Sequence, residues 1–495
     1  MQNVAVIGSG FSSLAAAAYL ADSGYEVVVY EKNASIGGRA RQLKKEGFTF
    51  DMGPTWYWMP DVFERFFNDL GEKVEDYYQL EKLSPGYQVY FGENDSVLIG
   101  DEPEKIYAEF ERIEAGSSEK LRKFLKEAEY NYEVAIKDLV YRPGLSPLEL
   151  VTPQTVTKVG QFFTTIKKTV EARFKDDRLR QLVMFPVLFL GAKPSDTPAF
   201  YSFMNYADYV LGTWYPKGGM FSVVTGMQKL LINLGVKFEL NAGVEKINVV
   251  DGKVTGLRVN GKDLEYSLVL SGADYHHTES LLEESYRVYS SKFWKKRTFA
   301  PSALLFYVGF GKKLDGVEHH TLFFDESFEQ HAKAIYDDKV WPEKPLFYAS
   351  FPSRTEAETA PEGCETGIFL IPLASGLEDT EEVRQQYFRI IMDRFEHLTG
   401  LSVKDSILFH ESYCVNDFVS DYNAYGGNAY GLANTLLQTG FLRPRIKSRK
   451  VKGLYFTGQL TVPGPGVPPS LISGKIVSDL LKKENPIKES YERTI

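Results

Sequence analysis

The sequence predicts an α/β protein organised around a nucleotide-binding unit at its N-terminus. Residues 3–7 (N-V-A-V-I) form a short apolar run, typical of a strand that is buried on both faces. A Gly-rich turn follows, and residues 14–20 are rich in Ala and Leu, as in a helix. A second apolar run, residues 26–30, closes with Glu31. The fingerprint of a Rossmann-type dinucleotide site is this order of elements: strand, Gly turn, helix, strand and acidic residue.

The residues of this fingerprint have separate physical roles. Gly8 permits the tight turn, and Gly10 lets the backbone approach a pyrophosphate, which then meets the N-terminus of the helix. Glu31, 21 residues after Gly10, is placed to accept hydrogen bonds from ribose hydroxyls. Ser13 replaces the third Gly, which serves close packing of helix on strand. The alternative is a strand–helix–strand turn without a ligand. The turn residues expected at the cofactor are Gly8, Gly10, Phe11, Ser12 and Ser13.

Composition excludes several classes of function. The 495 residues suffice for two or three domains, and a net charge of −9 argues against nucleic-acid binding. Cys364 and Cys414 form no CxxC motif, so neither a disulfide framework nor a cysteine metal site is expected. The histidines lack HxH or HxxxH spacing, and no metal is expected. The adjacent pairs at 276–277 and 319–320 should point to opposite sides of a strand.

No targeting or membrane-spanning segment is expected. The first strand begins by residue 3 without a basic segment before it, and the longest apolar run, residues 182–190, is half the length of a spanning helix. A cytoplasmic location is therefore predicted.

The middle of the chain alternates between predicted strands and helices. Residues 84–100 should form a hairpin turning at Asn94-Asp95, and residues 104–140 a helical stretch interrupted near Gly116. A second hairpin should turn at Asp251-Gly252. Further expected elements are helices at 228–234 and 381–398, strands at 268–274 and 453–458, and strands of one sheet at 303–310, 346–351 and 368–372.

Two aromatic or amphipathic segments leave alternatives open. Residues 56–59 (W-Y-W-M) are either core or a wall beside a flavin ring. Residues 146–175 place apolar side chains at helical spacing, with basic residues around them, which fits either a helix packed on its own domain or one lying in a membrane interface. The apolar positions are Val159, Phe162, Phe163, Ile166, Val170 and Phe174, and the basic ones are Lys158, Lys167, Lys168, Arg173 and Lys175.

Six motifs along the whole chain resemble the bacterial carotenoid desaturases of the phytoene desaturase type, within the flavin amine-oxidase superfamily. They are Gly8-x-Gly10, residues 37–40 (G-G-R-A), 51–55 (D-M-G-P-T), 215–219 (Y-P-K-G-G), 271–274 (S-G-A-D) and 463–468 (P-G-P-G-V-P). Many relatives have His where Val462 stands here, so a role given to that His does not transfer.

The resemblance implies FAD rather than NAD, and it implies which residues hold it. Arg39 can supply charge to the phosphates, the backbone at Val244 would meet the adenine, and the N-terminus of the last helix would face the flavin pyrimidine. Beyond the turn, the expected cofactor residues are Glu31, Lys32, Gly38, Arg39, Gly53, Pro54, Thr55, Val244, Gly458, Gln459, Val467 and Pro468.

The same resemblance implies a domain plan. The FAD-binding domain would be built from residues 1–83, 225–290 and 441–485, and an inserted α+β substrate domain from 84–140 and 291–440. Residues 141–224 would form a helical, membrane-contacting region, and 486–495 a charged tail.

The implied reaction is desaturation of a C40 carotene such as phytoene towards lycopene. Flavin takes a hydride from an allylic carbon and a neighbouring proton then leaves; the sequence identifies no residue that accepts it. The expected partners are a lipophilic carotenoid, a membrane surface bound peripherally, and oxygen or a quinone as electron acceptor. Alternatives are a later-acting carotenoid desaturase, a carotene isomerase, a retinol-saturase-like enzyme, a flavin amine oxidase and a non-catalytic FAD-binding protein.

Overall fold

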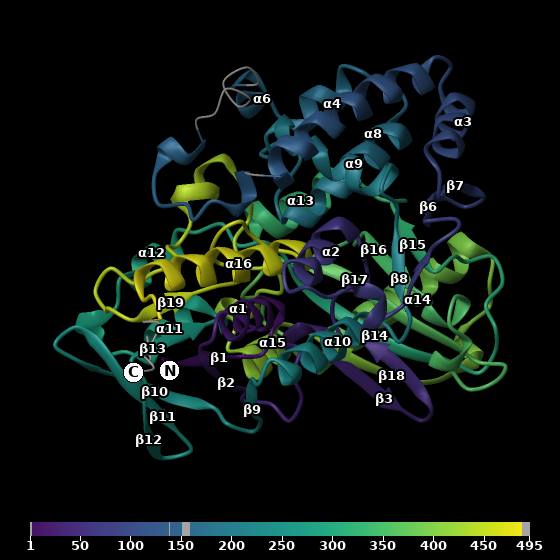
Figure 1. The fold of residues 1–495 in the computed structure, drawn as a ribbon. Coiled ribbons are helices and arrows are strands. Elements are labelled where there is room, and N and C mark those ends of the chain that lie inside the picture. Colours follow the sequence, from purple (N-terminus) through teal and green to yellow (C-terminus); the bar gives the residue numbers. More distant parts are fainter. Residues whose placement is uncertain (1, 138, 151–158, 488–495) are drawn as a thin grey trace.

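The computed structural model describes residues 2–137, 139–150 and 159–487, and its fold is built on two sheets (Figure 1). The first is a five-stranded parallel sheet with strand order β19-β13-β1-β2-β9. Its strands are β1 (Asn3–Ile7), β2 (Glu26–Tyr30), β9 (Lys237–Glu239), β13 (Leu268–Ser271) and β19 (Leu454–Phe456). The predicted strand–helix–strand unit is therefore confirmed, with the N-terminal strand in the middle of the sheet.

Helices and a small sheet cover the two faces of this parallel sheet. The helices α1 (Phe11–Asp22), α10 (Met220–Asn233) and α16 (Val467–Glu484) share one apolar core. The other face packs on the antiparallel sheet of β10 (Val244–Val250), β11 (Lys253–Val259) and β12 (Lys262–Glu265). The predicted hairpin turn at Asp251-Gly252 is present, with positive φ at both residues.

Ser13 shows how the missing third glycine is compensated. Its hydroxyl oxygen lies 2.1 Å from the position that a Cβ at Gly272 would occupy. The close approach of α1 to the end of β13 is thus achieved by a glycine on the strand side. Likewise, a Cβ at Gly474 of α16 would lie 2.7 Å from the Cβ of Ala15 on α1.

The second sheet has seven strands in the order β18-β14-β17-β16-β15-β6-β7. All neighbours are antiparallel except β15 and β6. The strands are β6 (Tyr87–Gly92), β7 (Asp95–Ile99), β14 (Ser302–Phe310), β15 (His320–Phe323), β16 (Phe347–Ser350), β17 (Glu365–Leu373) and β18 (Ile407–Tyr413). The predicted strands at 303–310, 346–351 and 368–372 do share one sheet. The β6–β7 turn lies at Glu93-Asn94, one residue earlier than predicted, because Asn94 takes the left-handed conformation.

The helix α14 (Glu381–Thr399) lies against this sheet and supplies much of its second core. Two small ribbons flank the sheets: β3 (Gln42–Lys45) with β4 (Phe48–Asp51), and β5 (Leu80–Lys82) with β8 (Trp214–Pro216). The remaining short helices are α2 (Pro60–Asn68), α11 (Tyr275–Ser280), α12 (Ser291–Lys295), α13 (Phe328–Lys333) and α15 (Val415–Tyr422).

A helical layer forms the end of the molecule farthest from the small β10–β12 sheet (Figure 1). Gly116 separates the two helices α3 (Pro103–Ile113) and α4 (Ser117–Lys137), as predicted. They are joined by α6 (Val159–Phe163), α7 (Ile166–Glu171), α8 (Asp177–Met184), α9 (Phe203–Tyr209) and the 3₁₀ segments Phe185–Leu190 and Ala199–Ser202. In the described part of the chain, no helix combines the length and apolarity that a bilayer crossing needs.

The prediction of one amphipathic helix across 146–175 is wrong. The described residues there form separate short helices, interrupted at Thr164 and Thr165. Ile166, Val170 and Phe174 are fully buried, so this part of the apolar face packs inside the protein. Lys158 and the side chain of Val159 lie outside the described residues, as does most of the predicted tail at 486–495.

The predicted placement of the histidine pairs is also wrong. His276 and His277 belong to the helix α11 rather than to a strand. His319 precedes β15 and His320 begins it, and the two rings touch, with centroids 4.5 Å apart. A bend before the strand, which the sequence pattern does not show, brings them to the same side.

Candidate active site

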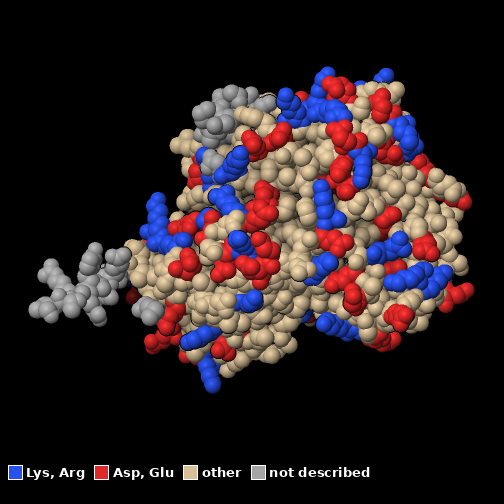
Figure 2. All heavy atoms as spheres, turned by 45° about the vertical axis from the view of Figure 1, so that its right-hand side comes forward, with Lys and Arg blue, Asp and Glu red and all other residues tan. Residues whose placement is uncertain are grey.

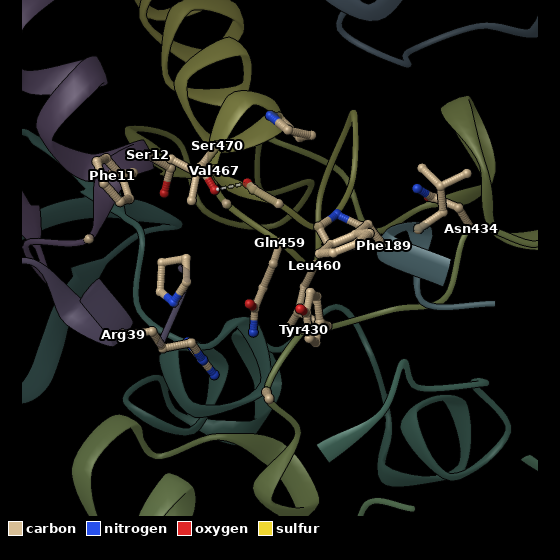
Figure 3. Close-up of a pocket in the computed structure, with 18 of the residues that line it drawn as sticks. Phe11, Ser12, Arg39, Phe189, Tyr430, Asn434, Gln459, Leu460, Val467 and Ser470 are labelled. Carbon is tan, nitrogen blue, oxygen red and sulfur yellow. Dashed lines mark hydrogen bonds between the residues drawn. The ribbon is translucent and has the colours of Figure 1, made fainter. Parts of the chain in front are cut away.

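One large cavity of about 1130 Å³ connects the parallel sheet, the seven-stranded sheet and the helical layer. Its wall includes every residue predicted to hold the cofactor except Ser13, whose side chain packs on Gly272. Residues that lie far apart in the sequence therefore meet at one site. Figure 3 shows part of it, with Phe11 and Ser12 on one side, Gln459 in the middle, and Phe189 and Tyr430 on the other side.

The N-terminus of α1 is open towards this cavity. Gly8 has φ +86°, a backbone conformation that favours glycine, and a Cβ there would lie 3.4 Å from Ala273 N. Glycine at this position therefore permits the tight turn. A Cβ at Gly10 would meet no other atom within 4 Å, because the space beside it belongs to the cavity. The first helical hydrogen bond is donated by Leu14 N, so the three preceding N–H groups remain for a ligand.

Glu31 is held rigidly at the same end of the cavity. The carboxylate is only 4% exposed and accepts hydrogen bonds from Ser9 N (3.0 Å), Ser9 Oγ (2.6 Å) and Asn33 N (2.9 Å). Lys32 turns away and donates to Ser420 O at 2.6 Å. A carboxylate fixed in this way can accept further hydrogen bonds from hydroxyl groups without reorganising.

Arg39 is a half-buried cation that forms no salt bridge with the described residues. It donates from Nη2 to Asn428 O at 3.0 Å and lies over the ring of Tyr422 at 4.9 Å. Its Nε is buried without a hydrogen-bond partner, and burial lowers its pKa. Gly53 admits the turn beside it, since a Cβ there would lie 2.2 Å from Arg39 O. An unneutralised guanidinium with an unused donor fits an anionic group such as a pyrophosphate.

The N-terminus of α16 reaches the cavity beside that of α1, where Val467 and Ser470 lie next to Ser12 (Figure 3). Gly458 follows β19 with φ +99°, where a Cβ would approach Ser12 Oγ at 3.0 Å. Pro468 and Pro469 carry no N–H, so Val467 supplies the N–H of the first turn. The side chain of Gln459 points towards Arg39 (Figure 3), and its Oε1 can accept from Arg39 Nη2 at 3.1 Å.

Beyond these polar groups the cavity wall becomes apolar and aromatic. The segment 56–59 is divided between cavity wall and core: Trp56, Trp58 and Met59 line the cavity, whereas Tyr57 is fully buried and stacks on Phe63. From the apolar run 182–190, Phe185, Leu188, Phe189 and Leu190 continue this wall.

Several wall residues were not found from the sequence. They include Phe200, Tyr336, Tyr348, Tyr430, Leu436, Leu437 and Leu442, while Leu188 and Phe189 lie in the noted apolar run. Their only sequence signal is the high aromatic content of 14%, which does not say where the residues gather. Val462 also lines the cavity. Neither cysteine is part of the wall.

Comparison with known proteins gives a consistent result. Residues 11–481 match the family described as flavin containing amine oxidoreductase. The carotenoid 3,4-desaturase of Haloarcula japonica is 40% identical over 484 residues, which cover 97% of this chain and 98% of that protein. The zeta-carotene-forming phytoene desaturase of Myxococcus xanthus is 31% identical over 491 residues, covering 97% and 94%.

Solved structures of the same fold are more distant in sequence. Putrescine oxidase bound to putrescine has 15% identity and a TM-score of 0.62, with 97% of this chain and 99% of that chain covered. Cyclohexylamine oxidase from Brevibacterium oxydans has 15% identity and a TM-score of 0.60, with coverages of 98% and 99%.

Proposed function

The chain belongs to the flavin containing amine oxidoreductase family and is an FAD-dependent oxidoreductase, and from this premise we propose that it desaturates a carotenoid. The observation that carries the proposal is the single cavity, whose polar end suits the cofactor and whose remaining wall is apolar and aromatic. A hydrocarbon substrate needs such a wall and no polar anchor.

The polar end would hold FAD through the residues already described. Arg39 and the N-terminus of α1 would bind the pyrophosphate, Glu31 the ribose, and the backbone at Val244 the adenine. Gly458, Gln459, Val467 and Pro468 would contact the flavin ring. Bound FAD supplies a two-electron acceptor for a hydride from an allylic carbon. The protein itself orients the chain of the substrate and excludes water with side chains such as Trp56 and Phe189.

Two substrates are supported by different observations. The resemblance over the whole chain supports a C40 carotene such as phytoene, as in the Myxococcus relative. The higher identity to the 3,4-desaturase supports a later-acting enzyme that extends an already conjugated carotenoid. For a C40 carotene, at about 0.8 kcal/mol per carbon, the transfer from water to oil is worth roughly 30 kcal/mol. The substrate must therefore be taken from a bilayer.

Exposed leucines form an apolar rim beside this cavity, and we assign membrane contact to it. We define the rim as Leu148, Leu436, Leu437 and Leu442; Leu148 and Leu437 are each 75% exposed. The 3₁₀ segments Pro147–Leu150 and Gly440–Leu442 contact each other, and the last three leucines line the cavity. Phe163 of α6 is a further large apolar side chain, 78% exposed, next to the cavity residue Phe162.

Two of the basic residues considered for membrane contact form ion pairs within the protein. Lys167 pairs with Glu329, and Arg173 pairs with Glu127 at 2.8 Å. On the face shown in Figure 2, Lys and Arg are interspersed with Asp and Glu. Insertion of the apolar rim therefore accounts for membrane binding better than a basic patch does.

An anaerobic experiment tests the proposed function. Purified protein with FAD is mixed with liposomes that contain phytoene or, separately, a conjugated carotenoid, and the oxidised flavin absorbance is followed while pigments are extracted. Bleaching with a more unsaturated product identifies the substrate, and reoxidation by air or by a quinone identifies the acceptor. Bleaching by an amine instead would show an amine oxidase. No bleaching with any carotenoid, despite intact liposome binding, would contradict desaturation.

A further inference from the structure

A chain of hydrogen bonds leaves the cavity wall between the two sheets. Thr55 Oγ1 and Tyr348 OH lie 2.8 Å apart, and Tyr348 OH lies 2.6 Å from Nδ1 of His320. Thr55 and Tyr348 line the cavity, whereas His320 is fully buried behind them. The indole of Trp56 stacks on the imidazole, with ring centroids 4.0 Å apart and an interplanar angle of 11°. A hydroxyl pair thus connects an apolar cavity to a buried base.

His320 differs from the other bases beside the apolar part of the cavity. His331 lines the wall, but its Nε2 donates to Pro372 O at 2.9 Å and its Nδ1 accepts from Leu346 N at 3.0 Å. Lys193 is paired with Asp337. In contrast, Nε2 of His320 has no hydrogen-bond partner among the described residues. Only Nδ1 of His320 is hydrogen-bonded, and its partner is the hydroxyl of Tyr348.

The location of Thr55 places the start of this chain near the proposed chemistry. Thr55 follows Gly53 and Pro54, which like Thr55 itself are expected to contact the cofactor, and it faces the same cavity as Trp56 and Tyr348. The chain therefore begins where the cofactor end of the cavity passes into its apolar end. A proton released at this point has no water to accept it, because the surrounding wall is aromatic and aliphatic.

We propose that Tyr348, with Thr55 beside it, receives the proton lost in the desaturation, and that His320 stores it; this rests on the proposed function. Departure of a hydride to FAD leaves an allylic cation. The C–H bond on the adjacent carbon then breaks, and its electron pair forms the new double bond. The proton passes to the hydroxyl oxygen of Tyr348, while the hydroxyl proton of Tyr348 moves to Nδ1 of His320. When product leaves and water enters the cavity, the imidazolium returns the proton by the same path to that water.

The surroundings of His320 suit a base that is neutral at rest. Burial lowers its pKa well below the ordinary histidine value, so the resting imidazole can accept a proton. A weak base suffices, because a proton next to a carbocation is strongly acidic. The titratable groups that face the ring are His319 and Tyr348. Once protonated, the imidazolium would be stabilised by the face of Trp56.

The test compares His320→Gln and Tyr348→Phe with the matched control His319→Gln. His319 is also buried and bonds a hydroxyl, Thr355 Oγ1, at 2.7 Å, but Thr355, unlike Tyr348, does not line the large cavity. With FAD and carotenoid-loaded liposomes, His320→Gln should lower kcat by about 100-fold and change KM by less than about threefold. A carotenoid deuterated at the proton-losing carbon should show a larger isotope effect than in the wild type. His319→Gln should retain wild-type values.

Two results would overturn the proposal. One is a kcat of His320→Gln within about threefold of wild type; the other is an unchanged isotope effect at the proton-losing carbon. If the wild type oxidises no carotenoid, the proposed function fails separately. The resting state of His320 can still be measured then, by ¹⁵N NMR of labelled histidine assigned with His320→Gln. The proposal expects a neutral ring at pH 7, and a protonated ring would contradict it.

Discussion

The two ends of the cavity are built in opposite ways. The cofactor end is formed by backbone turns and a few fixed polar groups, such as Gly10, Glu31 and Arg39. The apolar end is formed by side chains from distant segments, among them Trp56, Phe189 and Tyr430. At the cofactor end, a single added atom should therefore disturb cofactor binding. At the apolar end, substrate binding depends instead on the overall shape of the wall and on the exclusion of water. Substitutions that affect one end and spare the other test this difference.

The largest effect is expected from Gly10→Ala. Its φ of −72° suits alanine and a Cβ would touch no protein atom, so the fold should be unchanged. The added methyl would occupy the space of the pyrophosphate, and overpacking together with lost charge-assisted hydrogen bonds should cost about 3–6 kcal/mol of FAD binding. Titration with FAD should show a loss of about 100-fold or more. Gly160→Ala, with open space around its Cβ and an exposed position in α6, is the control. Wild-type FAD affinity in Gly10→Ala would mean that the cofactor lies elsewhere.

The same difference explains what the sequence could reveal. The cofactor end is encoded locally: a turn such as Gly8 to Gly10 requires particular residues at fixed spacing, so it can be recognised without a structure. Ser13 in place of the third glycine is compatible with the close packing of α1 on β13 only because Gly272, which lies far along the chain, makes room for it.

The apolar end has no such local code. Leu437 and Tyr430 look like ordinary loop residues, and only the fold brings them to the cavity. The single helix expected across 146–175 failed for a related reason. Its apolar periodicity is real, but Ile166 and Val170 satisfy it by packing inside the protein, in short helices interrupted at Thr165. Apolar periodicity does not say what an apolar face packs against, and here the tertiary contacts determine it.

A buried carboxyl behind the apolar end should make stability depend on pH. Burial raises the pKa of Asp208 to about 8, although Tyr87 OH donates to it at 2.7 Å. Between about pH 4 and pH 8 the folded chain keeps a proton that the unfolded chain releases, so this group favours the folded state less as the pH rises. Asp208→Asn should remove this dependence and gain on the order of 2 kcal/mol relative to wild type from pH 5.5 to 7.5.

Urea midpoints at several pH values check this expectation. The control is Asp263→Asn, since Arg258 holds the pKa of the exposed Asp263 carboxyl at about 2 and its charge does not change in that range. Parallel pH curves for Asp208→Asn and wild type would show that the buried carboxyl is ionised throughout.

The smallest effect is expected at the apolar rim, where Leu437→Ser removes a side chain that is 75% exposed. If the rim inserts into a bilayer, the lost apolar surface should weaken liposome binding by about 1 kcal/mol, or about fivefold. The matched control is Leu408→Ser, because Leu408 is 56% exposed on β18 and does not line the cavity. Flotation with neutral and anionic liposomes distinguishes apolar insertion from electrostatic binding by basic side chains. An equal loss of affinity for both lipids would identify apolar insertion by the rim. An unchanged affinity of Leu437→Ser, together with a strong preference for anionic lipid, would instead show that basic side chains such as Lys168 make the membrane contact.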